Sequence, residues 1–276
     1  LFGGVQRAGE AADANLAASH EDLRDVLVSL QAEVANNYLD LRGSQSRLAT
    51  TRNNVATQEK TVDLVRGRFQ TGLGNELDLM NAETKLALTK AALPALQRSM
   101  QQAMHQVAIL LGQAPAGLIP RLSKETGKLL VPPQIPINLP SELLRQRPDI
   151  RSAERRLAAA TAEIGVATAE LFPKFSLSGL LGLQSRNLSD LVTSGSRYWS
   201  IGPTLSLSLF DQGRIRAGIE ISKARRDQAL AGYEMTVLAA LAEVENALVA
   251  FTAEQDTESA LTKAVTSGKR AVTTAN

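Results

Sequence analysis

The residue types that most often carry out chemistry in proteins are scarce in this 276-residue chain. It contains no cysteine and only two histidines, His20 and His105, which lie far apart in the sequence. We find no Ser/His/Asp set, no phosphate-binding glycine loop and no paired carboxylates at a plausible cleft. A metal site would need carboxylates alone, and none cluster convincingly. The sequence therefore predicts no enzyme activity, no cofactor and no metal, and both histidines are interpreted as packed or solvated helix positions.

Charge and composition point to helices rather than to a nucleic-acid partner. The 30 Lys and Arg nearly balance the 28 Asp and Glu, which gives a net charge of +2. No basic stripe with interleaved aromatic residues is present, so we predict no nucleic-acid binding. Aromatic residues make up only 4% of the chain, whereas Ala, Leu, Gln and charged residues dominate, as in long helices and coiled coils. No uncharged apolar run approaches the ~20 residues of a membrane helix.

The polar side chains with the clearest functional pattern are the serines of residues 174–210, which read as one side of a β-hairpin. Each arm is about ten residues long and alternates between an apolar parity and a small, polar parity. The apolar parity, predicted to face lipid, contains Phe175, Leu177, Leu181, Leu183, Leu205, Leu207 and Leu209. The polar parity, predicted to face a pore, contains Ser176, Ser178, Thr204, Ser206 and Ser208.

This alternation is typical of a transmembrane β-strand, which needs ~9–11 tilted residues, apolar toward lipid and polar toward a watery lumen. A soluble sandwich also alternates, but its outer face usually carries charged residues, and there is no charge between Phe175 and Gln184 or between Ser200 and Phe210. Tyr198 and Trp199 adjoin the second arm, and we predict that both belong to an aromatic girdle at the membrane interface. Two strands cannot close a barrel, so other strands must complete it.

These strands are joined to long helices that occur twice in the chain. With a two-residue gap after Phe2, position n matches position n+210, so Gly3 falls on Gly213 and Val62 on Val272. Such internal repeats determine the fold and have to be recognised first. The first copy is entered at the last residues of a strand, and the second stops just before the feature that ends the first helix. We therefore expect the chain to be the middle of a longer protein.

The first copy holds two long helices that are predicted to form an antiparallel hairpin. Residues 5–69 contain no proline and carry apolar residues at heptad spacing, which predicts one helix on the order of 100 Å long in a left-handed coiled coil. Two glycines within 70–75 predict a tight reversal. The second helix should run over 76–111, with a kink at Pro94 and a stop at Gly112. The two seams are Leu27, Val34, Leu41, Leu48, Val55 and Val62, and Leu79, Leu86, Leu93, Met100 and Val107.

The second half of the chain begins after a proline-rich segment. Residues 113–140 hold six of the ten prolines and are predicted to form an extended connector, with a short strand at 128–131. Ser141 is a predicted N-cap for a short helix through Gln146, and a longer helix should start at Pro148. The predicted division is 1–4 (end of a strand), 5–112 (helical hairpin), 113–140 (connector), 141–172 (helices), 173–210 (β-hairpin) and 211–276 (long helix).

Several segments together resemble one family. The runs Arg147–Leu157, 164–167 and Leu171–Gly179 closely resemble the TolC-like outer membrane efflux proteins, and within them the NodT/OprM-type branch that serves RND tripartite pumps. Residues 209–217 look like the strand-to-helix junction of that family, and residues 68–79 look like its periplasmic helical turn. The resemblance covers essentially the whole chain. Its first and third runs are highly specific, whereas the heptads are not.

The resemblance implies a mainly α fold with a β-hairpin: long antiparallel coiled-coil helices of a periplasmic α-barrel, and strands of a trimeric transmembrane β-barrel. Each subunit of the homotrimer would give four strands to a shared twelve-stranded barrel in outer membrane lipid. The implied function is the outer membrane exit duct of a tripartite efflux pump in a Gram-negative bacterium, with a periplasmic membrane-fusion adaptor and an inner-membrane RND transporter as partners. A signal peptide and a lipidation cysteine are expected before Leu1, and a second helical turn after Asn276.

The same resemblance suggests two groups of residues with specific roles. The candidate adaptor-contacting tip consists of Arg68, Gly72, Leu73, Leu77 and Asp78. A purely structural reading remains open there, because Gly72 makes the turn and Asp78 lies near a helix N-terminus, where a carboxylate is favoured. A salt-bridged anchor, interpreted as structural, is expected from Arg147, Asp149 and Arg151.

Two other functions remain open at this point. The same fold also serves as the outer membrane duct of type I secretion systems, and the inner-membrane partner would separate the two. A soluble periplasmic coiled-coil adaptor or scaffold explains the heptads equally well, but not the charge-free strand pair. Neither the substrate nor the lipidation and gating residues can be read from this sequence.

Overall fold

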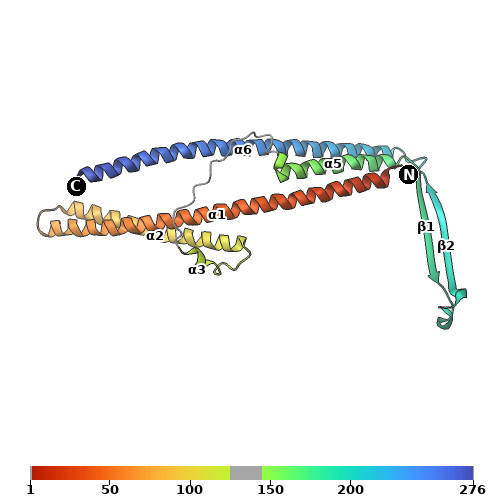
Figure 1. Ribbon diagram of the computed structural model, residues 1–276, viewed down its shortest axis with the longest axis horizontal. Coiled ribbons are helices and arrows are strands. Elements are labelled where there is room, and N and C mark those ends of the chain that lie inside the picture. Colours follow the sequence, from red (N-terminus) through yellow and green to blue (C-terminus); the bar gives the residue numbers. More distant parts are fainter. Residues whose placement is uncertain (1, 125–144, 276) are drawn as a thin grey trace. The chain divides into compact units, whose positions relative to one another are not determined.

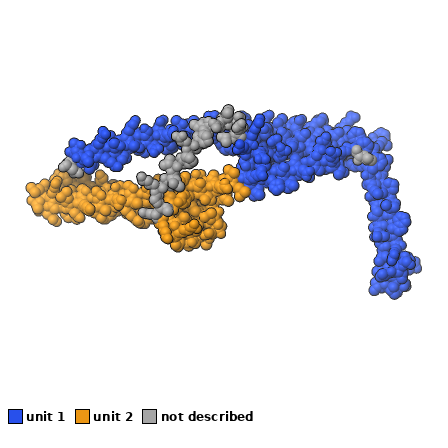
Figure 2. Space-filling model, viewed as in Figure 1, with its two compact units in different colours: residues 1–25, 137–276 blue, residues 26–136 orange. Residues whose placement is uncertain are grey.

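A computed structural model describes residues 2–124 and 145–275 of the chain. It divides into two compact units (Figure 2): unit 1 contains residues 1–25 and 137–276, and unit 2 contains residues 26–136. The first helix, α1 (Gly4–Gln70), passes through both units and confirms the predicted long helix of the first copy. Each unit is described by itself.

Unit 2 is the predicted helical hairpin, made by α1 from residue 26 onward and by α2 (Glu76–Leu110). The apolar seam of α1 is buried at Leu41, Leu48, Val55 and Val62. Its first member, Leu27, is exposed. Two ion pairs join the helices across the seam, Arg66 to Glu83 and Lys90 to Glu59, each at 2.8 Å. The α2 seam ends in the buried Val107, next to Met104 and Ala108. The α2 helix continues through Pro94, and the kink stays a prediction.

Both long helices of unit 2 end in the same motif. At the end of α1, the N–H of Leu73 donates to the carbonyl of Arg68 (2.8 Å), and the N–H of Gly72 donates to that of Phe69 (3.0 Å). At the end of α2, Gln113 and Gly112 make the equivalent bonds. Gly72 and Gly112 have φ values of +74° and +68°, which a residue with a Cβ rarely adopts. The predicted reversal at 70–75 and the stop at Gly112 are therefore confirmed.

The connector is only partly described. Its first residues contain a short helix, α3 (Ile119–Leu122), with Pro120 in the first turn. This helix differs from the fully extended connector that we predicted, and it forms because a proline is tolerated where the helical N–H has no partner anyway. The predicted strand at 128–131 and most of the predicted helix 141–146 lie outside the described residues. Arg145 and Gln146 are helical.

Unit 1 joins the beginning of α1, the helix α5 (Pro148–Ala169) and the long helix α6 (Arg214–Ala275) (Figure 1). Small residues let α1 and α5 approach closely. A Cβ on Gly4 would lie 3.0 Å from the Cβ of Ala169, and the aliphatic part of Arg7 fills the space that a Cβ on Gly165 would take. The alanines buried in this unit include Ala11, Ala18, Ala159, Ala162 and Ala240.

α6 packs along α5 over its first part, and from residue 249 to residue 274 every side chain is exposed. By length and composition alone, part of α6 is apolar enough to cross a membrane. However, its contact with α5 buries Ala240 and brings Glu243 to 2.7 Å from Arg147. α6 is therefore a packed helix of unit 1 over this stretch.

The two strands of unit 1, β1 (Lys174–Leu183) and β2 (Arg197–Ser206), form an antiparallel hairpin. Its connection contains two short 3₁₀ turns, η1 (Leu188–Asp190) and η2 (Ser194–Ser196). The predicted combination of long helices with a single β-hairpin is confirmed for the described residues.

Candidate functional site

The register of the hairpin sorts its side chains into two faces. Residues directly opposite each other in an antiparallel pair lie on the same side of the sheet. The leucine face holds the pairs Phe175–Leu205, Leu177–Pro203, Gly179–Ile201, Leu181–Trp199 and Leu183–Arg197. The serine face holds the pairs Lys174–Ser206, Ser176–Thr204, Ser178–Gly202, Leu180–Ser200 and Gly182–Tyr198. The predicted separation of the two parities within each arm therefore also holds between the arms.

The leucine face has no cover in the part of the chain that the structure describes. Leu177 is 71% exposed and Leu181 81% exposed. A two-stranded hairpin is marginally stable at best in water, and a continuous exposed apolar patch normally marks a surface that contacts lipid or protein. The leucine face therefore needs an apolar environment from beyond the described residues, and the serine face does not.

Two details of the predicted hairpin are corrected. β2 ends at Ser206, so Leu207, Ser208 and Leu209 lie beyond the hydrogen-bonded strand. The reason is that Ser206 already pairs with Lys174, the first residue of β1, and Pro173 before it has no N–H to donate. Strand pairing, and not the alternation in the sequence, sets this boundary.

The second correction concerns the predicted aromatic girdle. Tyr198 and Trp199 lie inside β2 rather than beside it, and as neighbours in a strand they point to opposite faces. Trp199 is on the leucine face opposite Leu181, whereas Tyr198 is on the serine face opposite Gly182. Only Trp199 can therefore belong to a girdle on the apolar surface.

The hairpin connection is held by its own hydrogen bonds. The N–H of Gln184 donates to the carbonyl of Ser196 (2.7 Å), which extends the pairing by one step. The carbonyl of Asp190 accepts from the hydroxyls of Thr193 (2.7 Å) and Ser196, and Ser196 is buried. Two apolar side chains of this connection are open to solvent, because Leu188 is 88% exposed and Val192 is exposed as well.

The predicted tip residues do gather at the turn between α1 and α2. Leu73 and Leu77 are exposed apolar side chains, and Arg68 is exposed beside them. Asn75 caps α2, because its side-chain oxygen accepts from the N–H of Leu77 at 2.6 Å. Gly72 makes the reversal and Asp78 lies in the first turn of α2, so both residues have the structural roles that the sequence predicted for them. A role of this turn in binding an adaptor stays a prediction.

The predicted anchor divides into two clusters, both within unit 1. Arg147 binds both oxygens of Asp149 (3.1 and 2.8 Å) and also Glu243 on α6 (2.7 Å). The hydrogen bond between Arg147 and Asp149 raises the pKa of the guanidinium and lowers that of the carboxyl, and Glu243 further raises the pKa of Arg147. Arg151 does not join them.

The second cluster ties α5 to α1 and was missed in the sequence. Arg151 contacts Glu21 at 3.1 Å, and Glu21 also accepts from Arg24 at 2.7 Å. Glu21 is 7% exposed. The next residue of α1, Asp22, accepts from the hydroxyl of Ser152 (2.5 Å), and Arg156, about one turn further along α5, donates to it as well (2.7 Å). Adjacent acidic residues on a long polar helix carry no sequence signal that would name such partners.

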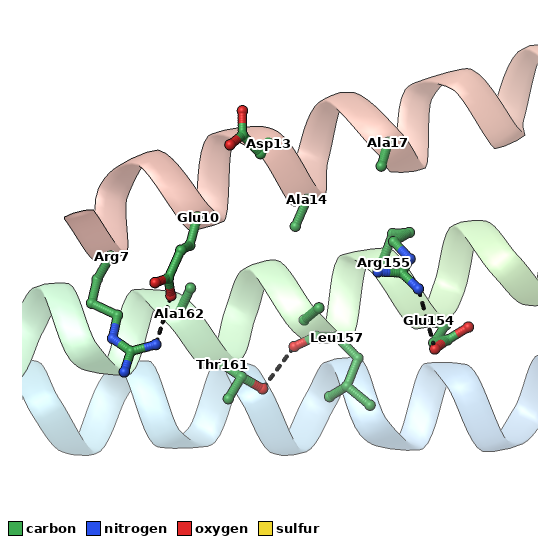
Figure 3. A pocket seen from close by; sticks show the side chains of 11 residues that line it. Arg7, Glu10, Asp13, Ala14, Ala17, Glu154, Arg155, Leu157, Thr161 and Ala162 are labelled. Atoms are coloured by element: carbon green, nitrogen blue, oxygen red, sulfur yellow. Dashed lines mark hydrogen bonds and ion pairs between the residues drawn. The ribbon is translucent and has the colours of Figure 1, made fainter. Parts of the chain in front are cut away.

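An open groove lies between α1 and α5 in unit 1 (Figure 3). Ala14, Ala17 and Ala162 are among the small residues that line it, with charged side chains around them. Four of its five charged side chains form ion pairs: Arg7 donates to Glu10 at 2.6 Å, and Arg155 lies 3.5 Å from Glu154. The groove contains no nucleophile beside a base, and its shape reflects the small residues of this helix pair.

Hydrogen bonds to Asp211 fix the backbone of the turn between β2 and α6. Asp211 accepts from the N–H groups of Gly213 (3.1 Å) and Ile215 (2.8 Å). These two bonds lower the pKa of its carboxyl. Gly213 has a φ of +85°, and its repeat partner Gly3 has a φ of +77°. The repeat therefore extends to the backbone conformation. The repeat partners Phe2 and Phe210 differ in their packing. Phe2 stacks on Phe172 with ring centroids 5.0 Å apart, whereas Phe210 is 98% exposed.

Comparison with known proteins shows to which family the chain is similar. A family profile described as outer membrane efflux protein matches residues 1–113 and 139–276. The outer membrane protein OprJ of Pseudomonas aeruginosa is 39% identical over 273 residues, which are 99% of this chain and 57% of OprJ. The probable efflux pump outer membrane protein TtgC of Pseudomonas putida is 32% identical over 251 residues, covering 91% of this chain and 51% of TtgC.

A solved structure shows the same likeness. The outer-membrane channel OprN superposes with a TM-score of 0.84 at 43% identity, over 93% of this chain and 57% of OprN. This chain spans about half the length of the curated relatives it matches.

Proposed function

The chain belongs to the outer membrane efflux protein family, and from this premise we propose that the protein is the outer membrane exit duct of a tripartite efflux pump. The observation that carries the proposal is the register of the β-hairpin, which places serines on one face and exposed leucines on the other. A strand pair of this kind is stable when one face contacts lipid and the other faces water.

The duct would conduct its substrates passively. A small, uncharged polar wall offers hydrogen bonds to water and no strong binding site, so solutes can enter and leave it. The energy for transport would come from an inner-membrane transporter of the RND type. The substrate itself is not specified by a wall of serine and glycine, and the selectivity would lie largely in that transporter.

Closure of the barrel requires further strands. The outer edges of β1 and β2 have no partner strand in the described part of the chain, and unpaired backbone groups are too costly to face lipid. The first copy of the repeat and two further subunits would supply the missing partners in a homotrimer. The leucine face would then meet outer membrane lipid.

The helices would form the periplasmic extension of the duct. The α1–α2 turn would be its adaptor-contacting tip, with Leu73 and Leu77 as apolar contacts and Arg68 as a charged one. Because the turn is fixed by two backbone hydrogen bonds and by the Asn75 cap of α2, it would present these side chains to a helical hairpin of a membrane-fusion adaptor without much loss of entropy.

Thiol labelling of the full-length protein tests the facing directly. Thr204→Cys and Leu205→Cys change neighbouring residues of β2 that lie on opposite faces. In intact cells, a membrane-impermeant maleimide should label the cysteine at 204 much faster than the one at 205. Equal labelling of both positions would overturn the pore assignment.

Identification of the inner-membrane partner tests the type of pump. The protein should fractionate with the outer membrane, and cross-linking should capture a membrane-fusion adaptor together with an RND transporter. Capture of an ABC-type transporter instead would indicate a type I secretion duct. Recovery in the soluble periplasmic fraction would indicate a coiled-coil scaffold.

A further inference from the structure

The serine face carries one aromatic side chain, Tyr198, and the residue directly opposite it is a glycine. A Cβ built on Gly182 would lie 2.7 Å from Cε1 and 2.8 Å from both Cζ and the hydroxyl oxygen of Tyr198. The far end of the tyrosine therefore occupies the space that the side chain of any other residue at 182 would need. The ring lies across the neighbouring strand instead of standing away from the sheet.

The surroundings of this ring are small and uncharged. The two neighbouring pairs on the same face are Leu180–Ser200 and Ser178–Gly202. The one charged residue on this face of the two strands is Lys174, which lies at the opposite end of β1 and pairs with Glu170 at 3.1 Å. Tyr198 remains 41% exposed, so part of its π surface is open to whatever passes along the face.

We propose that Tyr198, positioned by Gly182, is a solute-contacting residue of the duct wall that favours planar organic cations. This inference rests on the proposed function, because that function places the serine face toward the lumen. The face of an aromatic ring attracts cations through its quadrupole. On the serine face of β1 and β2 the one cation, Lys174, lies at the far end of β1, so it neither competes for the ring nor repels a positively charged solute there.

Gly182 has a specific part in this arrangement. An alanine at 182 would place its Cβ inside normal contact distance of the tyrosine, so the ring would have to swing off the sheet. A glycine in a strand interior has an entropic cost, and here it leaves room for the ring. An aromatic side chain over a strand glycine also stabilises hairpins, so the test must separate the π surface from simple coverage of the glycine.

The test is block of single-channel current by ethidium, a planar aromatic cation, in the full-length protein reconstituted into planar lipid bilayers. Tyr198→Leu keeps an apolar cover over Gly182 and removes the π system, and it should raise the half-blocking concentration roughly two- to fivefold. Tyr198→Phe retains the ring and should block like the unmodified protein. Trp199→Leu, on the opposite face, should leave the block unchanged. Gly182→Ala should lower the open conductance, and Tyr198→Ser in that background should restore it.

Two results would overturn the inference while the proposed function stands. One is an unchanged block in Tyr198→Leu, in channels that still show selective labelling at position 204. The other is an equal loss of block in Tyr198→Phe and Tyr198→Leu, which would show that the ring is not the contact. If labelling at 204 and 205 is equal, the proposed function itself fails first.

Discussion

The described residues form an antiparallel hairpin of helices in unit 2 and one of strands in unit 1, and the leucines of these two hairpins differ in exposure. In the helical hairpin the seam of α1 turns inward onto α2, and Leu41 is 0% exposed. In the β-hairpin the leucines point outward, and Leu181 is 81% exposed. The first hairpin obtains its apolar environment from its own chain, whereas the second has to obtain it from its surroundings. Similar residues thus form a folding core in one place and the proposed lipid-facing surface in the other.

The largest effect on stability is expected when a buried leucine is removed from the helical seam, which tests whether that seam is the folding core. Leu41→Ala should lower the free energy of unfolding by about 2–5 kcal/mol, because it deletes a fully buried side chain and leaves a cavity. Chemical denaturation of the full-length protein in detergent measures the change. Leu39→Ala, at an exposed position two residues away, is the control and should change stability by less than about 0.5 kcal/mol. Equal effects of the two substitutions would contradict the assignment of the seam.

A charge on the leucine face of the β-hairpin should have the next largest effect. Leu177→Arg lies near the middle of β1, and at such a position arginine costs about 2–4 kcal/mol in a membrane barrel. We expect little folded trimer in the outer membrane, as measured by heat-resistant migration on gels. The matched control is Ser178→Arg, the next residue on the opposite face, which should assemble normally. A normal yield of Leu177→Arg would mean that the leucine face does not contact lipid.

The ion pairs of the helices should matter less and should depend on pH. Because Arg147 lowers the pKa of Asp149 in the folded protein, this carboxylate stabilises the fold fully above its unfolded pKa of about 4. Its contribution is lost as the pH falls through the lower, folded value. Asp149→Asn should therefore cost about 1–2 kcal/mol at pH 7, and the deficit should shrink below pH 4. Asp13→Asn, at an exposed position, should show a much smaller deficit. A deficit independent of pH would argue against the pairing with Arg147.

The tip should give the smallest effect on stability and a large one on assembly. Leu73→Asp and Arg68→Glu change exposed side chains, so the free energy of unfolding should change by about 0.5 kcal/mol or less. Site-specific cross-linking to the adaptor and drug resistance should nevertheless fall. Gln70→Glu, an exposed change on the same turn, serves as the control for added negative charge. Unchanged cross-linking in both tip variants would leave Arg68 and Leu73 without a role in pump assembly.

Most of the fold could be predicted because its two periodicities are long and regular. Heptad spacing over many turns and strict alternation over ten residues each have one physical explanation, a coiled-coil seam and a two-faced strand. The turns at Gly72 and Gly112 were also predictable, since glycine is the residue that adopts a positive φ at low cost.

What escaped prediction depends on pairing between distant segments. The end of β2 is fixed by Lys174 on the other strand, and the face of Tyr198 is fixed by its position inside β2 rather than beside it. The contacts of Asp22 with Ser152 and Arg156 join residues on α1 and α5 that no periodicity connects. Local sequence patterns give the faces of an element, but the partner of each side chain follows from how the elements meet.

The small residues between α1 and α5 have a consequence for the width of the proposed duct. In a closed ring of helices the circumference is the sum of the spacings between neighbouring axes, and these spacings depend on the side chains at each contact. Gly4, Ala11 and Ala18 recur every seven residues on the contact side of α1. Larger residues at these positions would push the axes apart and increase the perimeter. In the proposed tunnel, the small side chains at these positions would therefore keep the bore narrower than larger residues would.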